Sequence, residues 1–195
     1  MSKHIEIESN MRFSFDASKW ASLMQYDVQT DYKKMKDVVQ ETKAVDFIGI
    51  LEGEILSFIE VKNFRGHRIE NKPRLDKGHD PLELEIAHKV RDTIAGIIAF
   101  ARESTHSQEK WIKYSRFLLN PKKRIDVILW LEEDENPVPT ALRIKRDNAK
   151  GGFFARRLKQ KMKWLTPHVS VFNIADNPYD SSLKVEFLPE KTTVR

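Results

Sequence analysis

Three charged residues in otherwise apolar segments are the strongest candidates for chemistry. Asp46 lies in the apolar run 45–51, and Glu60 and Lys62 lie in the run 55–62. A charge in a buried strand is costly unless it is paired or binds a metal. Glu60 and Lys62 are two residues apart, so on a strand their side chains leave the same face. Because Mg²⁺ prefers carboxylate, water and phosphate oxygens, the trio predicts a cation site where Lys62 orients or deprotonates an attacking water.

The turn between the two runs decides whether the carboxylates meet. A two-residue loop at Glu52-Gly53 places Asp46 opposite Ile59, and therefore on the other face from Glu60. A turn of odd length, or a single bulge, places Asp46 directly opposite Glu60. The metal-site hypothesis therefore predicts the longer turn, and its alternative is a partly exposed structural ion pair.

The two segments that carry these residues resemble a known nuclease superfamily. The sequences Ala44-Val45-Asp46-Phe47-Ile48-Gly49 and Ile59-Glu60-Val61-Lys62-Asn63-Phe64-Arg65-Gly66-His67 are similar to the motif of the PD-(D/E)xK superfamily, which has the restriction-endonuclease-like fold. The resemblance covers about residues 30–102, including the expected helix after the motif. It implies an αβββαβ core and a magnesium or manganese ion bound by Asp46, Glu60 and the backbone carbonyl of Val61, with Lys62 serving the water.

The chain departs from the superfamily pattern at one position and leaves another open. Val45 stands where the name of the motif has proline, which leaves the acid in place. The superfamily often adds an acid from its first helix, and Asp27 and Asp31 are both candidates here. Some members have lost catalysis, but this chain keeps the three central residues and is therefore expected to be active.

Basic residues near the motif and near the C-terminus are candidates for binding phosphates. Arg65, His67 and Arg68 follow the motif lysine, and Lys89 lies on the helix after it. The segment 141–168 holds nine Lys/Arg against one acid, and we take Arg156 and Lys159 as its representatives. Clustered basic surface suits a polyanion such as nucleic acid, although a solvated helix face has the same composition.

The elements that must position these residues follow an α/β order. Patterning predicts helices near residues 18–24 and over residues 30–40, 82–102 and 152–165. It predicts strands over residues 45–51, 55–62, 125–131 and 169–174. The expected fold is therefore an α/β protein with a mixed central β-sheet flanked by helices, as a single domain over residues 1–195.

Composition excludes several other classes of protein. The 195-residue chain has a net charge of +5 and no cysteine, which excludes disulfides, thiolate metal sites and a cysteine nucleophile. No signal peptide or membrane span is visible, and a cytoplasmic location is expected. Gly151-Gly152 lacks the lysine of a phosphate-binding loop, so no nucleotide cofactor is expected.

These observations favour a Mg²⁺- or Mn²⁺-dependent nuclease that hydrolyses phosphodiester bonds in DNA, in restriction, repair or defence against mobile DNA. The main alternative is a catalytically inactive nucleic-acid-binding or assembly subunit on the same fold. A weaker one is a protein-interaction domain that uses the acidic run 132–135 and the basic helix. The expected partner is DNA, with a homodimer or a partner protein left open.

Overall fold

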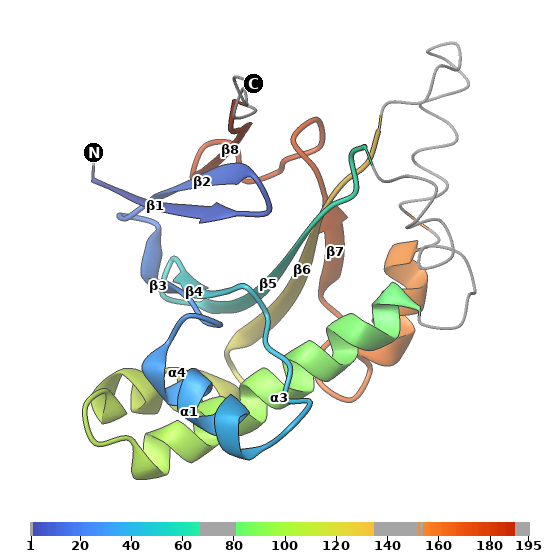
Figure 1. Ribbon diagram of the computed structural model, residues 1–195. Coiled ribbons are helices and arrows are strands. Elements are labelled where there is room, and N and C mark those ends of the chain that lie inside the picture. Colours follow the sequence, from blue (N-terminus) through green and yellow to red (C-terminus); the bar gives the residue numbers. More distant parts are fainter. Residues whose placement is uncertain (1, 67–80, 135–151, 153, 190–195) are drawn as a thin grey trace, which may run out of the picture.

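The computed structural model of the chain describes residues 2–66, 81–134, 152 and 154–189, which form two β-sheets and a layer of helices (Figure 1). The larger sheet has the order β3-β4-β5-β6-β7. Its strands are β3 (Trp20–Gln25), β4 (Phe47–Leu51), β5 (Ile55–Asn63), β6 (Arg124–Glu132) and β7 (Val169–Phe172). Neighbours are antiparallel from β3 to β5 and parallel from β5 to β7, so the sheet is mixed, as expected.

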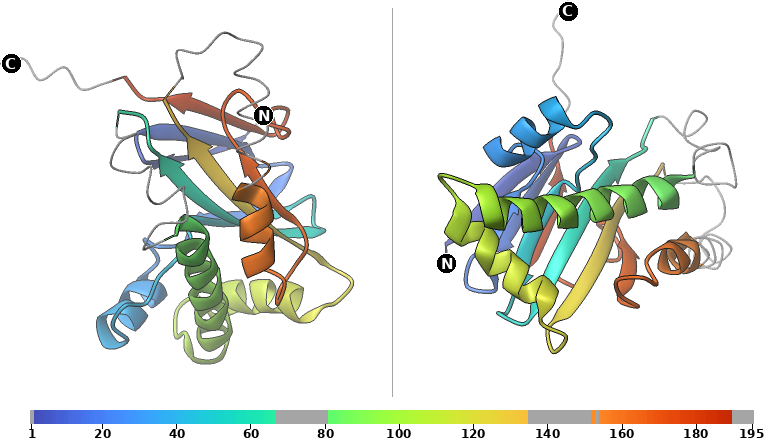
Figure 2. Two further views of the ribbon diagram at one scale, coloured as in Figure 1. Left: turned by 90° about the vertical axis from the view of Figure 1, so that its right-hand side faces the viewer. Right: turned by 90° about the horizontal axis from the view of Figure 1, so that it is seen from below.

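Helices cover one face of the larger sheet. They are α1 (Thr30–Val38), α3 (Leu82–Glu103), α4 (Gln108–Leu119) and a helical stretch over residues 154–161. Figure 2 shows α3 crossing the strands with α1 and α4 on its two sides. The predicted apolar stripe of α3 is confirmed, since Ile86, Val90 and Ile97 are fully buried in the same cluster as Ile48 and Phe58. No helix in these described ranges has both the length and the apolar character needed to cross a membrane.

A second, smaller sheet covers the opposite face. Its antiparallel strands are β1 (Lys3–Glu8), β2 (Met11–Asp16) and β8 (Leu183–Phe187), in the order β1-β2-β8. Alternating apolar residues of β2 are fully buried, and the Phe13 ring packs 5.3 Å from that of Phe47 and 5.7 Å from that of Trp130. The expectation that helices flank the sheet is therefore correct for one face only, because β2 supplies its own apolar face to cover the other.

The helix predicted near residues 18–24 is wrong, because this segment is strand β3. Trp20 and Met24 are four residues apart, which imitates a helical repeat. The register of β3 against β4 shifts between Ala21 and Met24, and Ser22 adopts a left-handed φ of 57°. This bulge reverses the alternation, so that Trp20 packs under the small sheet while Met24 packs under the helices.

The order of the elements agrees in part with the αβββαβ expectation. Along the described chain, α1 is followed by β4, β5, α3, α4 and β6. Two described strands therefore lie between α1 and α3 where the expected core has three, and the remaining strand of the antiparallel meander, β3, precedes α1. The predicted helix over residues 30–40 and the predicted strands after it are confirmed within a few residues.

Candidate functional site

The β4–β5 hairpin has the register that the metal-site hypothesis requires. Leu51 pairs with Ile55 and Phe47 pairs with Ile59, so the turn holds three residues, 52–54. Continuing this register by one residue places Asp46, immediately before β4, directly opposite Glu60. The two carboxylates consequently leave the same face of the sheet.

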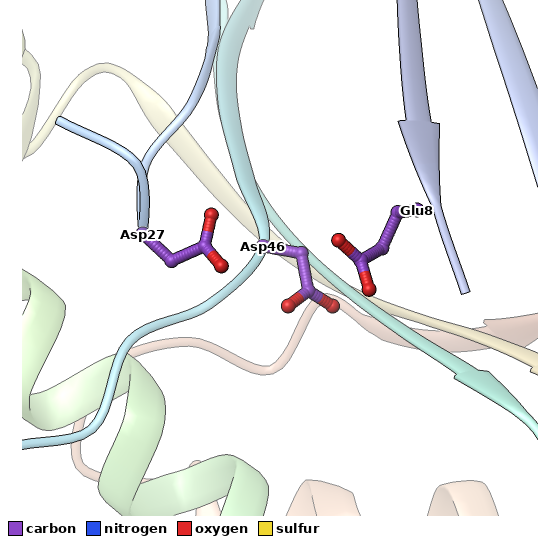
Figure 3. A group of neighbouring side chains, drawn as sticks. All are labelled: Glu8, Asp27 and Asp46. Carbon is purple, nitrogen blue, oxygen red and sulfur yellow. The ribbon is translucent and has the colours of Figure 1, made fainter.

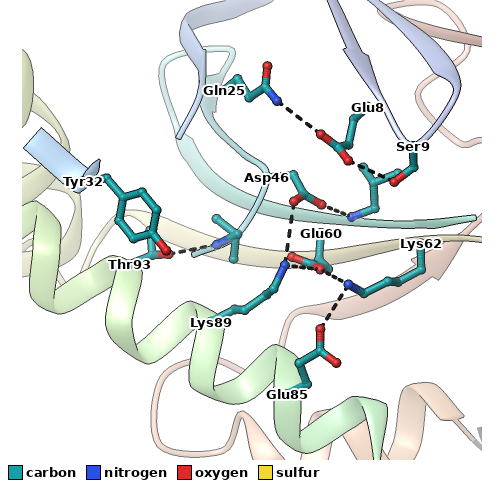
Figure 4. A network of polar contacts seen from close by, with 12 residues as sticks. Glu8, Ser9, Gln25, Tyr32, Asp46, Glu60, Lys62, Glu85, Lys89 and Thr93 are labelled. Atoms are coloured by element: carbon teal, nitrogen blue, oxygen red, sulfur yellow. Dashed lines mark hydrogen bonds and ion pairs between the residues drawn. The ribbon is translucent and has the colours of Figure 1, made fainter. Parts of the chain in front are cut away.

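That face is the one covered by α3, which adds two charged residues to the site (Figure 4). Asp46 and Glu60 are only 7% and 1% exposed. Glu85 and Lys89, one helical turn apart on α3, point toward the strands and meet Glu60 and Lys62. The charged side chains of the site therefore lie between the ends of two strands and one helix.

Both lysines contact the same oxygen of Glu60. Lys62 Nζ lies 2.8 Å from Glu60 Oε1 and 3.1 Å from Glu85 Oε1. Lys89 Nζ lies 2.6 Å from Glu60 Oε1 and 3.8 Å from Asp46 Oδ1. The other oxygen, Glu60 Oε2, is buried and has no hydrogen-bond partner among the described residues. An oxygen in this state is available as a cation ligand.

Burial dominates the protonation of the site. It raises the pKa of Asp46 to about 8, helped by the nearby charge of Glu60 and opposed by Lys89. Burial also raises the pKa of Glu60, against the opposing effects of Lys89 and Lys62. For Lys62, burial acts to lower the pKa, but its interactions with Glu60 and Glu85 outweigh burial, so the pKa lies above its ordinary value. Lys62 is therefore an ammonium at neutral pH.

A cluster of three carboxylates extends the site beyond the motif (Figure 3). One oxygen each of Glu8, Asp27 and Asp46 lie within 4.8 Å of one another. Asp27 Oδ1 is buried without a hydrogen-bond partner among the described residues, and burial followed by the charge of Glu8 raises the pKa of Asp27. The all-oxygen donor set of the cluster, with a buried and unsatisfied oxygen on Asp27, fits Mg²⁺ or Mn²⁺.

The structure separates the two acids between which the sequence left a choice. Asp27 lies in the carboxylate cluster, just before α1. Asp31, within α1, instead accepts hydrogen bonds on Oδ2 from Trp111 Nε1 at 2.7 Å and from Ser104 Oγ at 3.0 Å. Its role is to join α1 to α4 and to the end of α3, away from the cluster.

Glu8 is a site residue that the sequence reasoning missed. It ends β1 of the small sheet, and its carboxylate accepts hydrogen bonds from Gln25 Nε2 at 3.2 Å and from Ser9 Oγ at 2.9 Å. The alternation in residues 11–16, with Met11, Phe13 and Phe15 on one face, was the available signal for a strand here. This alternation could have predicted a partner strand over residues 3–8 in a hairpin. It could not have predicted that the end of this strand lies beside Asp46.

The backbone of Val61 faces the Asp46 side of β5. Its amide donates a hydrogen bond to Asp46 Oδ2 at 2.6 Å. In a strand the N–H and C=O of one residue point to the same neighbour, so the Val61 carbonyl lies on that edge too. This is where the resemblance requires a carbonyl ligand.

The predicted phosphate-binding residues fall in different places. Lys89 is engaged inside the site, whereas Arg65 is exposed and lies with its guanidinium 4.0 Å from the Phe187 ring centroid. Arg156 and Lys159 are exposed on the helical stretch 154–161. Arg157 anchors that stretch to α3 through Glu83 at 2.9 Å. His67 and Arg68 lie outside the described residues.

Comparisons with protein-family models, with curated proteins and with solved structures found no match to this chain.

Proposed function

We propose that this protein is a Mg²⁺- or Mn²⁺-dependent nuclease that hydrolyses phosphodiester bonds in DNA, on a restriction-endonuclease-like core. The observation that carries the proposal is the three-residue turn, which sets Asp46 opposite Glu60 with Lys62 on the same face. A hairpin with a purely structural role needs neither two carboxyl groups side by side nor their burial, since burying ionisable groups opposes folding.

The residues divide the chemistry among them. Asp46, Asp27 and Glu8, whose carboxylate oxygens lie within 4.8 Å of one another, would hold the cation. Glu60, opposite Asp46 on β5, and the Val61 carbonyl would complete the ligand set. The cation would offset the charge that builds on the phosphate during attack by water. Because the pKa of Lys62 lies above its ordinary value, this residue does not take a proton from the water at neutral pH. Its ammonium instead orients the water or binds a phosphate oxygen.

Exposed basic residues provide for binding of the DNA backbone. Arg65 lies two residues after the end of β5 and three after Lys62, and it is exposed, with its guanidinium over the Phe187 ring. Arg156 and Lys159 are on the helical stretch that Arg157 holds against the first turn of α3, the helix that also carries Glu85 and Lys89. Contacts of this kind bind phosphates without reading sequence, as suits a chain with little room for a separate recognition domain.

The ion pairs around Glu60 favour one second candidate, a non-catalytic DNA-binding or assembly subunit. Two ammonium groups already contact Glu60 Oε1, so the carboxylate is compensated without a metal. In that case Asp46, Glu60 and Lys62 would stabilise the packing of the hairpin against α3, and the basic surface would still bind DNA.

Cleavage of defined DNA substrates distinguishes the two candidates. Plasmid, linear duplex and single-stranded DNA would be incubated with Mg²⁺, Mn²⁺ or EDTA, using wild type, Lys62→Ala and the exposed control Lys33→Ala. We expect metal-dependent cutting that Lys62→Ala reduces at least about 100-fold and Lys33→Ala leaves unchanged. Inert wild type with intact, salt-sensitive DNA binding would support the non-catalytic subunit instead.

A further inference from the structure

Strand β1 lies at the edge of the small sheet. Among the residues that the structure describes, β2 is its one partner in that sheet. The Ser2 carbonyl accepts a hydrogen bond from Ala17 N at 3.1 Å, and the two-residue turn closes with Glu8 opposite Met11. The even-numbered residues of β1 therefore direct their backbone groups toward β2. The odd-numbered residues direct theirs outward, so the N–H and C=O groups of Lys3, Ile5 and Ile7 line the free edge.

The side chains of β1 are exposed on both faces. Ile5 and Ile7 point away from the large sheet and are 58% and 54% exposed. His4 lies opposite Phe15 on the inner face, yet it is exposed while Phe15 is fully buried. Glu6, opposite the buried Phe13, is likewise only half-buried. Strand β1 thus projects beyond the layer that covers β2, which leaves space beside it for another strand.

Both edges of the larger sheet carry features that discourage pairing. Strand β3 is interrupted by the bulge at Ser22, and β7 is only four residues long. Bulges and short edge strands are known protections against sheet extension. Strand β1 has neither, and instead offers six regular residues with two exposed isoleucines.

We propose that β1 pairs in antiparallel fashion with β1 of a second copy of this chain. In a two-fold pair the register must keep equivalent residues on one face. Pairing Ile5 with its own copy satisfies this condition and sets His4 opposite Glu6 on both sides of the axis. A register that sets Glu6 opposite its own copy puts two carboxylates together and is disfavoured.

This pairing makes the two small sheets continuous and covers apolar surface. The backbone groups of Ile5 pair with those of the other Ile5, and those of Lys3 with those of Ile7. The exposed isoleucine side chains of both copies then lie together on the outer face. The assembly requires neither metal nor DNA, so its test is independent of the proposed nuclease function.

A single cysteine tests the register, because the chain has no cysteine of its own. In the proposed pair the two Cα atoms of residue 5 are about 5.5 Å apart, within the span of a disulfide. Those of residue 7 are about 14 Å apart. Under oxidised glutathione, Ile5→Cys is therefore expected to form a covalent dimer on a non-reducing gel, whereas the matched Ile7→Cys is not. Equal cross-linking of both variants, or of neither, would overturn the proposed pairing.

The mass in solution provides the second measurement. By sedimentation, the wild type should reach twice the 22.9 kDa of one chain as concentration rises. His4→Glu should weaken the dimer at least tenfold, the double variant His4→Glu/Glu6→Lys should restore it, and Lys184→Glu on β8 should leave it unchanged. A folded wild type that stays monomeric at its highest soluble concentration would refute the proposal. So would a His4→Glu variant that dimerises as well as wild type.

Discussion

Lys89 Nζ lies 2.6 Å from Oε1 of Glu60, closer than any other cation in the described part of the site. The ammonium also lies 3.8 Å from Asp46 Oδ1, so it faces both of the carboxylates that the hairpin brings together. A single positive charge between two buried carboxylates occupies the kind of position in which a divalent ion is expected. Lys89 is therefore placed to compensate these carboxylates when no metal is bound, and to compete with a metal that arrives.

Removing this ammonium should change metal affinity and stability in opposite directions. In Lys89→Met, Mg²⁺ or Mn²⁺ no longer competes with a lysine, and we expect binding about tenfold tighter by calorimetry, equivalent to about 1.4 kcal/mol. In EDTA the same variant should unfold at lower urea than wild type, because the carboxylates lose a counter-charge. Arg91→Met is the control, since Arg91 is exposed on the same helix and pairs with Asp92. Unchanged metal affinity in Lys89→Met would contradict the competition.

Burial of Asp46 should make the metal-free protein less stable as pH rises. The pKa of Asp46 is raised to about 8 from an ordinary 3.8, so this carboxyl group holds its proton more tightly in the folded protein than in the unfolded chain. Its stabilising contribution is complete below about pH 4 and is lost as pH rises toward 8. Asp46→Asn cannot ionise and therefore avoids this loss. In EDTA at pH 8, its free energy of unfolding should exceed that of wild type by more than about 1.4 kcal/mol, the equivalent of one pKa unit.

Urea unfolding at several pH values in EDTA checks this expectation. The difference between wild type and Asp46→Asn should be small at pH 4 and grow toward pH 8. Adding Mn²⁺ at pH 8 should stabilise the wild type and leave Asp46→Asn unaffected. A constant difference across this pH range would show that Asp46 ionises without cost in the fold.

The central part of the site could be predicted because it depends on local sequence. Glu60 and Lys62 are neighbours on one strand, and Asp46 is joined to them by a hairpin whose register has only two alternatives. The choice between those alternatives rests on whether Glu54 belongs to the turn, which the sequence leaves open. The structure places it in the turn, so that Leu51 pairs with Ile55.

The rest of the site depends on contacts between distant elements, which local patterns do not reveal. Glu8 reaches Asp46 only because the small sheet packs on the large one, through rings such as Phe13 and Trp130. Helix α4 is not among the predicted elements, although the buried Trp111 and Tyr114 have helical spacing. Strand β3 was mistaken for a helix because its bulge cancels the period of two.

The two acids near α1 should respond differently to removal of their charge. Asp27→Asn takes away a carboxylate of the three-acid cluster, so metal binding should weaken at least about tenfold, with little loss of stability. Asp31→Asn impairs the acceptor of the Trp111 and Ser104 hydrogen bonds, so stability should fall by about 1–3 kcal/mol while metal affinity stays the same. Calorimetry with Mn²⁺ and urea unfolding measure the two effects.

Glu8→Gln belongs to the same test. Like Asp27→Asn, it should weaken metal binding with little loss of stability, since both residues contribute an oxygen to the cluster around Asp46. If Asp31→Asn weakens metal binding while Asp27→Asn and Glu8→Gln do not, the cation is not held by this cluster.

The helical stretch 154–161 should contribute to the salt dependence of DNA binding. The logarithm of the binding constant falls with the logarithm of salt by about 0.9 for each phosphate neutralised. Because Arg156 and Lys159 are both exposed, Arg156→Glu/Lys159→Glu should reduce this slope by about 2 and weaken binding at low salt. The matched control Lys33→Glu/Lys34→Glu makes the same change at exposed positions of α1 and should keep the wild-type slope. Fluorescence anisotropy over a salt series measures both, and equal slopes in the two variants would exclude this stretch as the DNA-binding surface.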